Sequence, residues 1–238
     1  MLVGDSKIGQ WQPAFEKLAK RAGWEVLTTT KSFCALTDAE MSSGTRVQDD
    51  CRQWGRTVMK EILRASPDVV VTSQVHDLAL PPGQMDPAKR TQAAMVDGLQ
   101  RYWRTLQAHG IKVVVLLDNP MPTTHPVDRC VEDHPESLSR CSFPLLVPLS
   151  KSAAPTQLEA ASLRGVGVID MASAYCPGKV MCPAVIGNVL IYRNGSHLTA
   201  SFARSATSQL EKQFCSATAG LFCADGTTRS LPETTTLR

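Results

Sequence analysis

The stretch Val69-Val70-Val71-Thr72 decides the fold class. It is a run of β-branched residues without polar alternation, which is the pattern of a strand buried on both faces of a sheet. Val113-Val114-Val115-Leu116-Leu117 repeats this pattern further along the chain. Strands buried on both faces are typical of parallel sheets that helices cover on either side. These two segments therefore predict the centre of an α/β fold.

Further strands and helices alternate on both sides of these segments. Apolar residues at three- and four-residue spacing predict helices, and Gly23 and Gly110 are expected to end the first and third of them. Residues 80–90 and the Pro-rich residues 118–155 are expected to be loops. The remaining expected strands are 1–4, 25–29, 166–169 and 189–192, and the expected helices are 11–22, 51–62, 95–106, 158–163 and 198–210. The alternation predicts a three-layer α/β/α sandwich around a mostly parallel sheet.

Length and composition set limits on the class of protein. The chain has 238 residues, of which 43% are hydrophobic and 20% charged, and we expect one domain over residues 1–223 with a disordered polar tail at 224–238. The net charge is 25 − 22 = +3 without a Lys/Arg cluster, so nucleic acid is not an expected partner. Apolar runs stay shorter than a membrane span, and the chain opens without the pattern of a signal peptide.

Eight cysteines fall into four local couples, whose partners are separated by 16, 10, 5 and 7 residues. The spacings lack the CxxC and Cys/His patterns of zinc sites, so no metal is expected. Eight buried thiols in a cytosolic protein are one interpretation, and a disulfide framework is the other. Disulfides require an oxidising compartment, which conflicts with the missing signal peptide. A fragment of a longer, exported protein resolves the conflict.

Two positions combine chemistry-bearing residues with the ends of predicted strands. In parallel sheets, ligand sites lie beyond the carboxyl ends of the strands. Gly4-Asp5-Ser6 follows the first strand, where a hydroxyl and a backbone N–H can face a ligand; Asp5 or Ser6 can equally serve as a helix cap. His197 follows the last strand and is expected to open the last helix. We expect Ser6 and His197 to lie within or near hydrogen-bond distance.

At these residues the sequence resembles a known family. Gly4-Asp5-Ser6 and His197-Leu198-Thr199 are typical of the SGNH (GDSL-like) hydrolase superfamily, and the cysteine couples match its domains fused to bacterial membrane acyltransferase-3 proteins. The other shared segments are Trp11, Gly23-Trp24, Thr30-Lys31-Ser32, Cys34, Cys51, Trp54, Pro67-Asp68-Val69-Val70, Asp118, Pro120 and Tyr192-Arg193. The resemblance covers residues 1 to about 210. It implies a flavodoxin-like sheet and the disulfides Cys34–Cys51, Cys130–Cys141, Cys176–Cys182 and Cys215–Cys223.

The resemblance also implies residue roles, and the chain departs from the family pattern at two of them. Ser6 is the implied nucleophile and His197 the implied base, but Asn194 stands where the family has Asp. In serine proteases with a Ser–His–Asp triad, the same replacement of Asp by Asn lowers kcat by about 10⁴. With Asn194 in this place, the chain can be a slow enzyme, a Ser–His dyad aided by a backbone carbonyl, or a disabled variant. The usual oxyanion Asn is also absent, so the candidate donors are Ser6, Ser32, Gln74 and His76.

The expected function is acyl transfer by a serine acyl-enzyme without a cofactor. The resemblance implies that an upstream membrane acyltransferase domain supplies an acyl group, acetyl in the simplest case. The acceptor is then a hydroxyl of a cell-envelope polysaccharide or glycolipid on the extracytoplasmic face of a bacterial membrane. A carbohydrate esterase with the same Ser6–His197 pair is an alternative, and so is a degenerate domain that only binds glycan.

Overall fold

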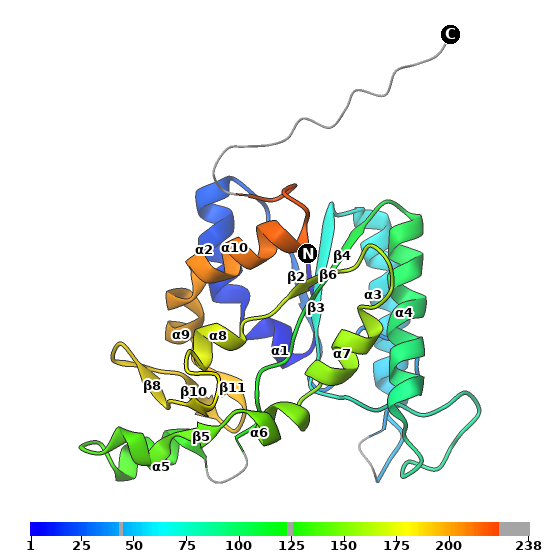
Figure 1. Ribbon diagram of the computed structural model, residues 1–238. Coiled ribbons are helices and arrows are strands. Elements are labelled where there is room, and N and C mark those ends of the chain that lie inside the picture. Colours follow the sequence, from blue (N-terminus) through cyan, green and yellow to red (C-terminus); the bar gives the residue numbers. More distant parts are fainter. Residues whose placement is uncertain (43–44, 123–125, 224–238) are drawn as a thin grey trace.

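The central sheet has five parallel strands. The computed structural model describes residues 1–42, 45–122 and 126–223. The strand order is β2-β1-β3-β4-β6, which is the flavodoxin-like order, and Figure 1 shows the strands side by side at the centre of the molecule. Val3 lies opposite Thr72, and Val71 lies opposite Val114. The strands are β1 (Leu2–Gly4), β2 (Thr28–Thr30), β3 (Val69–Ser73), β4 (Lys112–Leu116) and β6 (Gly167–Ile169).

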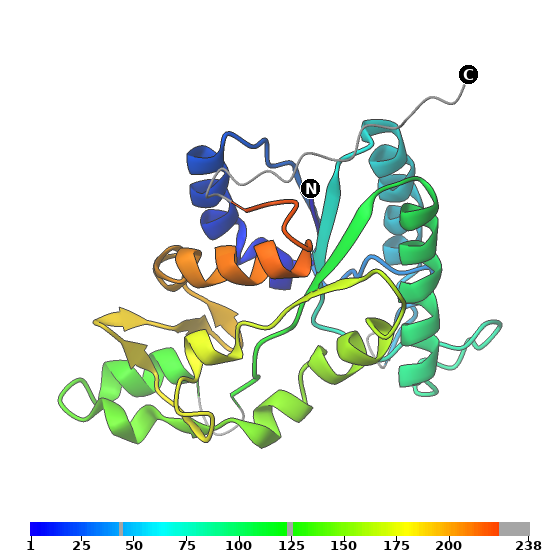
Figure 2. The same ribbon diagram turned by 45° about the horizontal axis from the view of Figure 1, so that its top comes forward.

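Helices cover both faces of this sheet, so the expected three-layer α/β/α architecture is confirmed. One face carries α2, α9 and α10, and the other carries α3, α4 and α7; Figure 2 separates the two layers. Gly23 ends α2 in the left-handed conformation, with φ of 72°. The helix bounds are α2 (Gln12–Ala22), α3 (Asp49–Ala65), α4 (Gln92–Ala108), α7 (Ala154–Ala160), α9 (Ala200–Ser205) and α10 (Thr207–Ala217).

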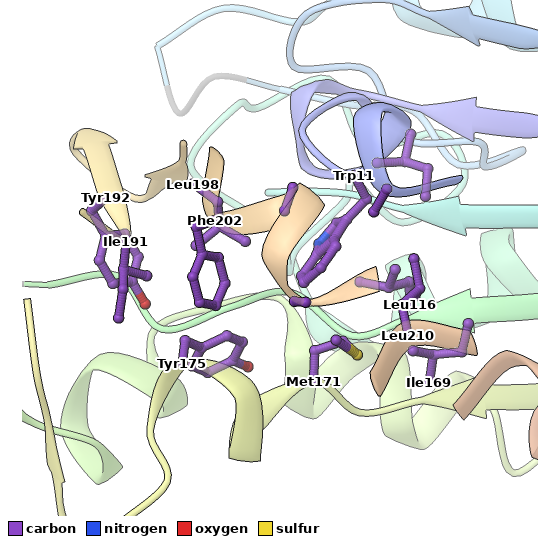
Figure 3. Packing of buried hydrophobic residues seen from close by; sticks show 14 of the residues in the cluster. Trp11, Leu116, Ile169, Met171, Tyr175, Ile191, Tyr192, Leu198, Phe202 and Leu210 are labelled. Carbon is purple, nitrogen blue, oxygen red and sulfur yellow. The ribbon is translucent and has the colours of Figure 1, made fainter. Parts of the chain in front are cut away.

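Successive residues of the central strands belong to two separate cores, because side chains alternate across a sheet. Val71 and Val114 pack on the α2–α10 side, whereas Val70 and Val115 pack on the α3–α4 side. Figure 3 shows the first core, in which Trp11 lies among Leu116, Ile169 and Leu210. This double burial is the reason why the central strands are continuous runs of apolar residues.

The chain between β4 and α9 is more structured than the sequence indicates. The expectation of loop over residues 118–155 is wrong, because this part contains α5 (Val127–Asp133), a 3₁₀ helix (Leu138–Cys141), β5 (Phe143–Pro144) and α6 (Leu146–Ser150). Pro126 starts α5, and Pro144 lies in a two-residue edge strand, which are positions where proline costs no backbone hydrogen bond. After β6 follow α8 (Ala172–Tyr175) and β7 (Met181–Cys182), which pairs with β5.

Two hairpins precede α9, and they correct the expectations for the strand 189–192 and for the helix 198–210. The expected strand 189–192 is divided between β9 (Val189–Leu190), which pairs with β8 (Val185–Ile186), and β10 (Tyr192–Asn194), which pairs with β11 (His197–Leu198). His197 therefore lies in a strand and does not open the last helix. That helix begins only at Ala200, where the Thr199 side chain accepts the N–H of Phe202, and it breaks at Ala206 into α9 and α10. The expected strand 25–29 lies further along the chain, as β2 (Thr28–Thr30). Its last residue, Thr30, pairs with Gly4 of β1.

All eight cysteines form disulfides, and each disulfide joins the two members of one local couple: Cys34–Cys51, Cys130–Cys141, Cys176–Cys182 and Cys215–Cys223. Such a framework indicates an oxidising compartment. Within the described residues, none of the helices combines the length and the apolarity that crossing a membrane would take. The expected disordered tail, residues 224–238, lies outside the described residues.

Candidate active site

The first strand ends in a turn that presents Ser6 at the carboxyl edge of the sheet. Gly4 has a φ of 147°, and a Cβ at this position would overlap the carbonyl oxygen of Ser73 in β3. Only glycine allows β1 and β3 to come this close with this backbone conformation. Ser6 then begins the short helix α1 (Ser6–Gly9), so the helix itself offers its N–H no acceptor. The Ser6 N–H is thereby available to a ligand.

Asp5 holds this turn in place. One of its carboxylate oxygens accepts the Lys7 N–H at 2.8 Å, and the other accepts the Val75 N–H at 2.8 Å. Burial raises the pKa of Asp5 to about 7, although both N–H groups act in the opposite direction. The carboxyl group therefore ties the Ser6 turn to the segment after β3, in keeping with the structural role expected for Asp5.

Ser6 and His197, which are far apart in sequence, meet at this edge. The Ser6 Oγ lies 2.8 Å from His197 Nε2, and His197 Nδ1 lies 3.2 Å from the backbone carbonyl oxygen of Asn194. A carbonyl oxygen only accepts, so Nδ1 carries the proton and Nε2 is free to accept the Ser6 proton. Burial lowers the pKa of His197, which favours the neutral imidazole. Together, these groups have the geometry of a nucleophile and its general base.

Asn194 contributes its backbone to this arrangement. Its carbonyl oxygen faces the imidazole, while its side chain lies at the exposed end of β10. Of the options that the sequence leaves open, the geometry corresponds to a Ser–His dyad aided by a backbone carbonyl. The 194 side chain is therefore not the group that orients His197 in this structure.

The remaining oxyanion candidates differ in their placement. Ser32 lies exposed in the turn after β2. Gln74 is fully buried and turns inward, where its side-chain oxygen is 3.5 Å from Gln157 Nε2. The His76 ring packs against Phe33, with 6.0 Å between the ring centroids, and burial lowers its pKa. Of the four candidate oxyanion donors, the Ser6 N–H therefore lies beside the Ser6 hydroxyl, whereas the Gln74 side chain points into the protein.

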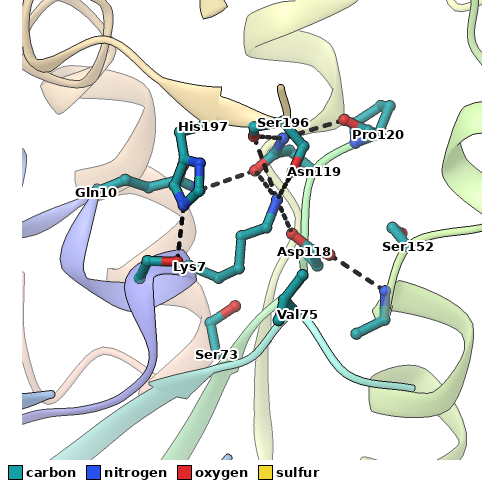
Figure 4. Close-up of polar contacts among 12 residues, drawn as sticks. Lys7, Gln10, Ser73, Val75, Asp118, Asn119, Pro120, Ser152, Ser196 and His197 are labelled. Atoms are coloured by element: carbon teal, nitrogen blue, oxygen red, sulfur yellow. Dashed lines mark hydrogen bonds and ion pairs between the residues drawn. The ribbon is translucent and has the colours of Figure 1, made fainter. Parts of the chain in front are cut away.

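A buried polar cluster lies behind the dyad, and the sequence analysis assigned it no role. Figure 4 shows the Lys7 ammonium group at its centre. The Lys7 Nζ forms an ion pair with Asp118 at 2.9 Å, and both side chains are 0% exposed. Burial raises the pKa of Asp118, and Lys7 lowers it. We call the residues Lys7, Gln10, Asp118, Asn119 and Ser196 the Lys7 cluster.

One signal in the sequence pointed to this cluster. Asp118-Asn119 follows the buried strand β4 after one intervening residue, Leu117, so both residues lie at the same sheet edge as Ser6. Lys7 and Gln10 offer no comparable signal, because a lysine next to the nucleophile is read by default as an exposed side chain. Ser196 likewise offers no signal in the sequence, since a serine in a turn before a strand is common.

One family model matches this chain, and several solved structures resemble it. The model of the SGNH domain (fused to AT3 domains) matches residues 1–212. The periplasmic domain of a lipopolysaccharide acetyltransferase from Salmonella ser. Paratyphi A is 12% identical, with a TM-score of 0.62 over 89% of this chain and 81% of that one. A putative acylhydrolase from Bacteroides fragilis is 14% identical, with a TM-score of 0.50 over 91% and 86% of the two chains.

A GDSL-like lipase from Bacteroides thetaiotaomicron is 15% identical, with a TM-score of 0.48 over 90% of this chain and 86% of that chain. No curated protein sequence matches the chain. At these identities the Salmonella and Bacteroides fragilis structures establish the fold alone, and the family model covers most of the sequence.

Proposed function

Because the chain belongs to the family of SGNH domains fused to AT3 domains, a family of acyl transfer and ester hydrolysis, we propose that it is an O-acyltransferase domain. Its substrate would be an acyl donor, acetyl in the simplest case, and its acceptor a hydroxyl of a cell-envelope polysaccharide or glycolipid. The Ser6–His197 contact is the observation that carries this proposal. The acetyltransferase activity named for the Salmonella structure agrees in chemistry with such a site.

In the proposed reaction, His197 Nε2 takes the Ser6 proton as the Oγ attacks the acyl carbonyl carbon. The Ser6 N–H stabilises the negative oxygen that develops on this carbon. The tetrahedral intermediate then collapses, the donor's leaving group departs with the proton from His197, and an acyl-serine remains. The acceptor hydroxyl next gives its proton to His197 and attacks the acyl-serine. The second tetrahedral intermediate releases the new ester as the bond to Ser6 Oγ breaks, and His197 returns the proton to this oxygen.

The donor and the location belong to the same proposal. We propose that a membrane acyltransferase domain of the same protein presents the acyl group at the extracytoplasmic face of a bacterial membrane. The four disulfides support an oxidising location. None of the proposed steps uses a cofactor, and each step is assigned to groups of this chain or of its substrates.

A non-catalytic, glycan-binding domain is the second candidate function. It is favoured by the partner of His197 Nδ1 within the described residues, which is the neutral Asn194 carbonyl and not a carboxylate. It is opposed by the 2.8 Å contact between Ser6 and His197, which ligand binding alone does not require. The esterase alternative uses the same pair of residues with water as the acceptor.

Turnover of p-nitrophenyl acetate tests the proposal. The wild-type chain should release nitrophenol and accumulate an acetyl group on the peptide that contains Ser6. Ser6→Ala should lower the rate by about 10³-fold or more, because the covalent intermediate cannot form. Ser205→Ala in α9 is the matched control and should leave the rate unchanged.

Two outcomes separate the alternatives. Equal, background-level rates for the wild type and Ser6→Ala, with both chains folded, would remove the catalytic proposal and leave the glycan-binding one. If acetyl-Ser6 forms, added polysaccharide should speed its breakdown and become acetylated. Breakdown by water alone, at a rate that the polysaccharide does not change, would identify an esterase.

A further inference from the structure

The backbone on both sides of His197 is held by side chains from other parts of the chain. The carbonyl oxygen of Ser196 accepts hydrogen bonds from Lys7 Nζ at 3.2 Å and from Asn119 Nδ2 at 2.7 Å. On the other side, the N–H of Leu198 donates to Gln10 Oε1 at 2.8 Å. The residues before and after the imidazole are thus fixed by different side chains of the Lys7 cluster, which Figure 4 shows.

The groups that hold this backbone also hold one another. Gln10 Nε2 donates to Asn119 Oδ1 at 2.8 Å, and Lys7 Nζ lies 3.5 Å from the same oxygen. Lys7 additionally donates to Ser196 Oγ at 2.8 Å and pairs with Asp118. The cluster is buried, so its groups have no water to replace a lost partner, and each contact supports the others. Such a network keeps a single arrangement.

This network starts from the turn that carries the nucleophile. Lys7 follows Ser6 directly, and Gln10 follows at the end of α1. The distance between Ser6 and His197 is therefore set within one connected group of atoms. By contrast, among the described residues the imidazole Nδ1 is oriented by a single neutral group, the Asn194 carbonyl oxygen at 3.2 Å. A carboxylate would orient and stabilise the imidazolium more strongly than this carbonyl.

We propose that Lys7, Gln10 and Asn119 are positioning residues, which hold His197 in line with Ser6 by fixing the backbone of Ser196 and Leu198. They provide the orientation that an aspartate at position 194 would otherwise give. This inference rests on the proposed function for its effect on rate, but the position and tautomer of the imidazole can be measured without turnover.

The sharpest variant is Gln10→Met, which keeps the length of the side chain and removes no charge. It takes away the acceptor of the Leu198 N–H and one donor to Asn119. The ¹⁵N shifts of His197, assigned by their absence in His197→Gln, should change from the single Nδ1–H tautomer to a mixture. Turnover of p-nitrophenyl acetate should show kcat lower by about 10- to 100-fold and KM within about twofold, because geometry is lost and substrate binding is not.

A paired variant covers the case in which Gln10→Met fails to fold. Lys7→Met with Asp118→Asn removes both charges together, so that neither is left alone in the interior. It also removes the Lys7 contacts with Ser196 and should give the same mixture of tautomers. Thr218→Val is the matched control, because it deletes a buried hydroxyl in the turn after α10 and should leave the His197 shifts and kcat at wild-type values.

Each outcome decides one of the two proposals. If a folded Gln10→Met or the folded paired variant keeps the single tautomer and the wild-type kcat, the positioning role is wrong. If Thr218→Val changes the tautomer as much as the cluster variants do, the effect is one of general stability, and the positioning role is again wrong. If the tautomer depends on the cluster while the wild type forms no acetyl-Ser6, positioning stands and the proposed transferase function fails.

Discussion

The two sides of Ser6 are built in different ways. On one side, His197 is held by the Lys7 cluster, in which buried side chains from three separate parts of the chain contact one another. On the other side, where the oxyanion of a reaction would form, the candidates are the Ser6 N–H, the exposed Ser32, the inward-turned Gln74 and His76. Phe33 lies there at 60% exposure with φ of 63°, against the His76 ring.

This difference shows which part of the chemistry the fold specifies by side chains. A general base needs one tautomer and one direction: the Asn194 carbonyl favours the Nδ1–H tautomer, and in our proposal the buried network fixes the direction. An oxyanion needs only N–H groups at the right place, which the backbone supplies whatever the side chains are. Departures from the family pattern are therefore more easily accommodated on the oxyanion side, provided that the backbone of the turns is kept.

The largest effect is expected at Gly4, in the turn after β1, where the backbone conformation and the close approach of β3 both require glycine. Gly4→Ala should lower the free energy of unfolding by about 3 kcal/mol or more, because the new Cβ overlaps the Ser73 carbonyl and forces β1 from β3. Gly195→Ala, beside His197, also has a positive φ, 54°, but nothing lies near its Cβ, so it should cost about 1 kcal/mol. Urea unfolding measures both.

Equal losses in the two glycine variants would contradict this part of the comparison. They would mean that the close approach of β1 and β3 adjusts freely and that only the left-handed conformation matters. A Gly4→Ala chain that keeps wild-type stability and acetyl-Ser6 formation would further show that the oxyanion side tolerates backbone movement.

A smaller effect is expected from Asn194→Asp. In serine proteases with a Ser–His–Asp triad, loss of the carboxylate lowers kcat by about 10⁴. The change from Asn to Asp can restore the whole of this factor only if the new carboxylate faces Nδ1. Here the backbone carbonyl occupies that place and the side chain is exposed, so the gain in kcat should stay below about tenfold. Asn188→Asp adds the same charge in the exposed β8–β9 turn and is the control.

A gain of 100-fold or more for Asn194→Asp would overturn this interpretation. It would place the 194 side chain behind the imidazole during reaction, and the Lys7 cluster would then be an incomplete substitute for the carboxylate. No gain at all, in a folded variant, would sharpen the contrast, because it would assign the whole orientation of His197 to the backbone.

The smallest effect is expected from Gln74→Leu. The Gln74 Nε2 is buried without a hydrogen-bond partner among the described residues, so replacing it should leave the free energy of unfolding unchanged or raise it. The rate of acetyl-Ser6 formation should stay within about threefold of wild type. A loss of about 10² to 10³ would instead identify Gln74 as an oxyanion donor. Gln157→Leu, whose amide oxygen accepts the Asp118 N–H at 2.7 Å, should cost about 1–3 kcal/mol and is the contrast.

The central fold was predictable because its pattern is local. The valine runs of β3 and β4 identify strands covered on both faces, and their alternation with helices predicted the parallel sheet, which is confirmed. The two hairpins were not predictable in this way, because strands of two or three residues carry too little pattern and depend on non-local pairing. The break at Ala206 was hidden as well, since Phe202 and Leu210 keep helical spacing across it.

The candidate site also has features that the sequence predicts and features that it does not. Ser6 and His197 were expected to meet because both follow strands at one edge, and the structure places them in contact. The direction of Asn194 depends on the backbone of a hairpin, and the burial of Lys7 depends on Asp118, a partner from the segment that follows β4. A single sequence contains no local signal for either. The predicted roles of these residues await the experiments above.

The sequence separation of the dyad has a consequence for how the domain matures. Ser6 and His197 are 191 positions apart, whereas each disulfide closes a loop with a separation of 17 or less. Oxidation can therefore stabilise local segments early, but it cannot bring the two ends of the sheet together. Contacts of such long range form late in folding. Until the β10–β11 hairpin docks, the Ser6 hydroxyl therefore lacks the contact with the His197 imidazole that it has in the folded domain.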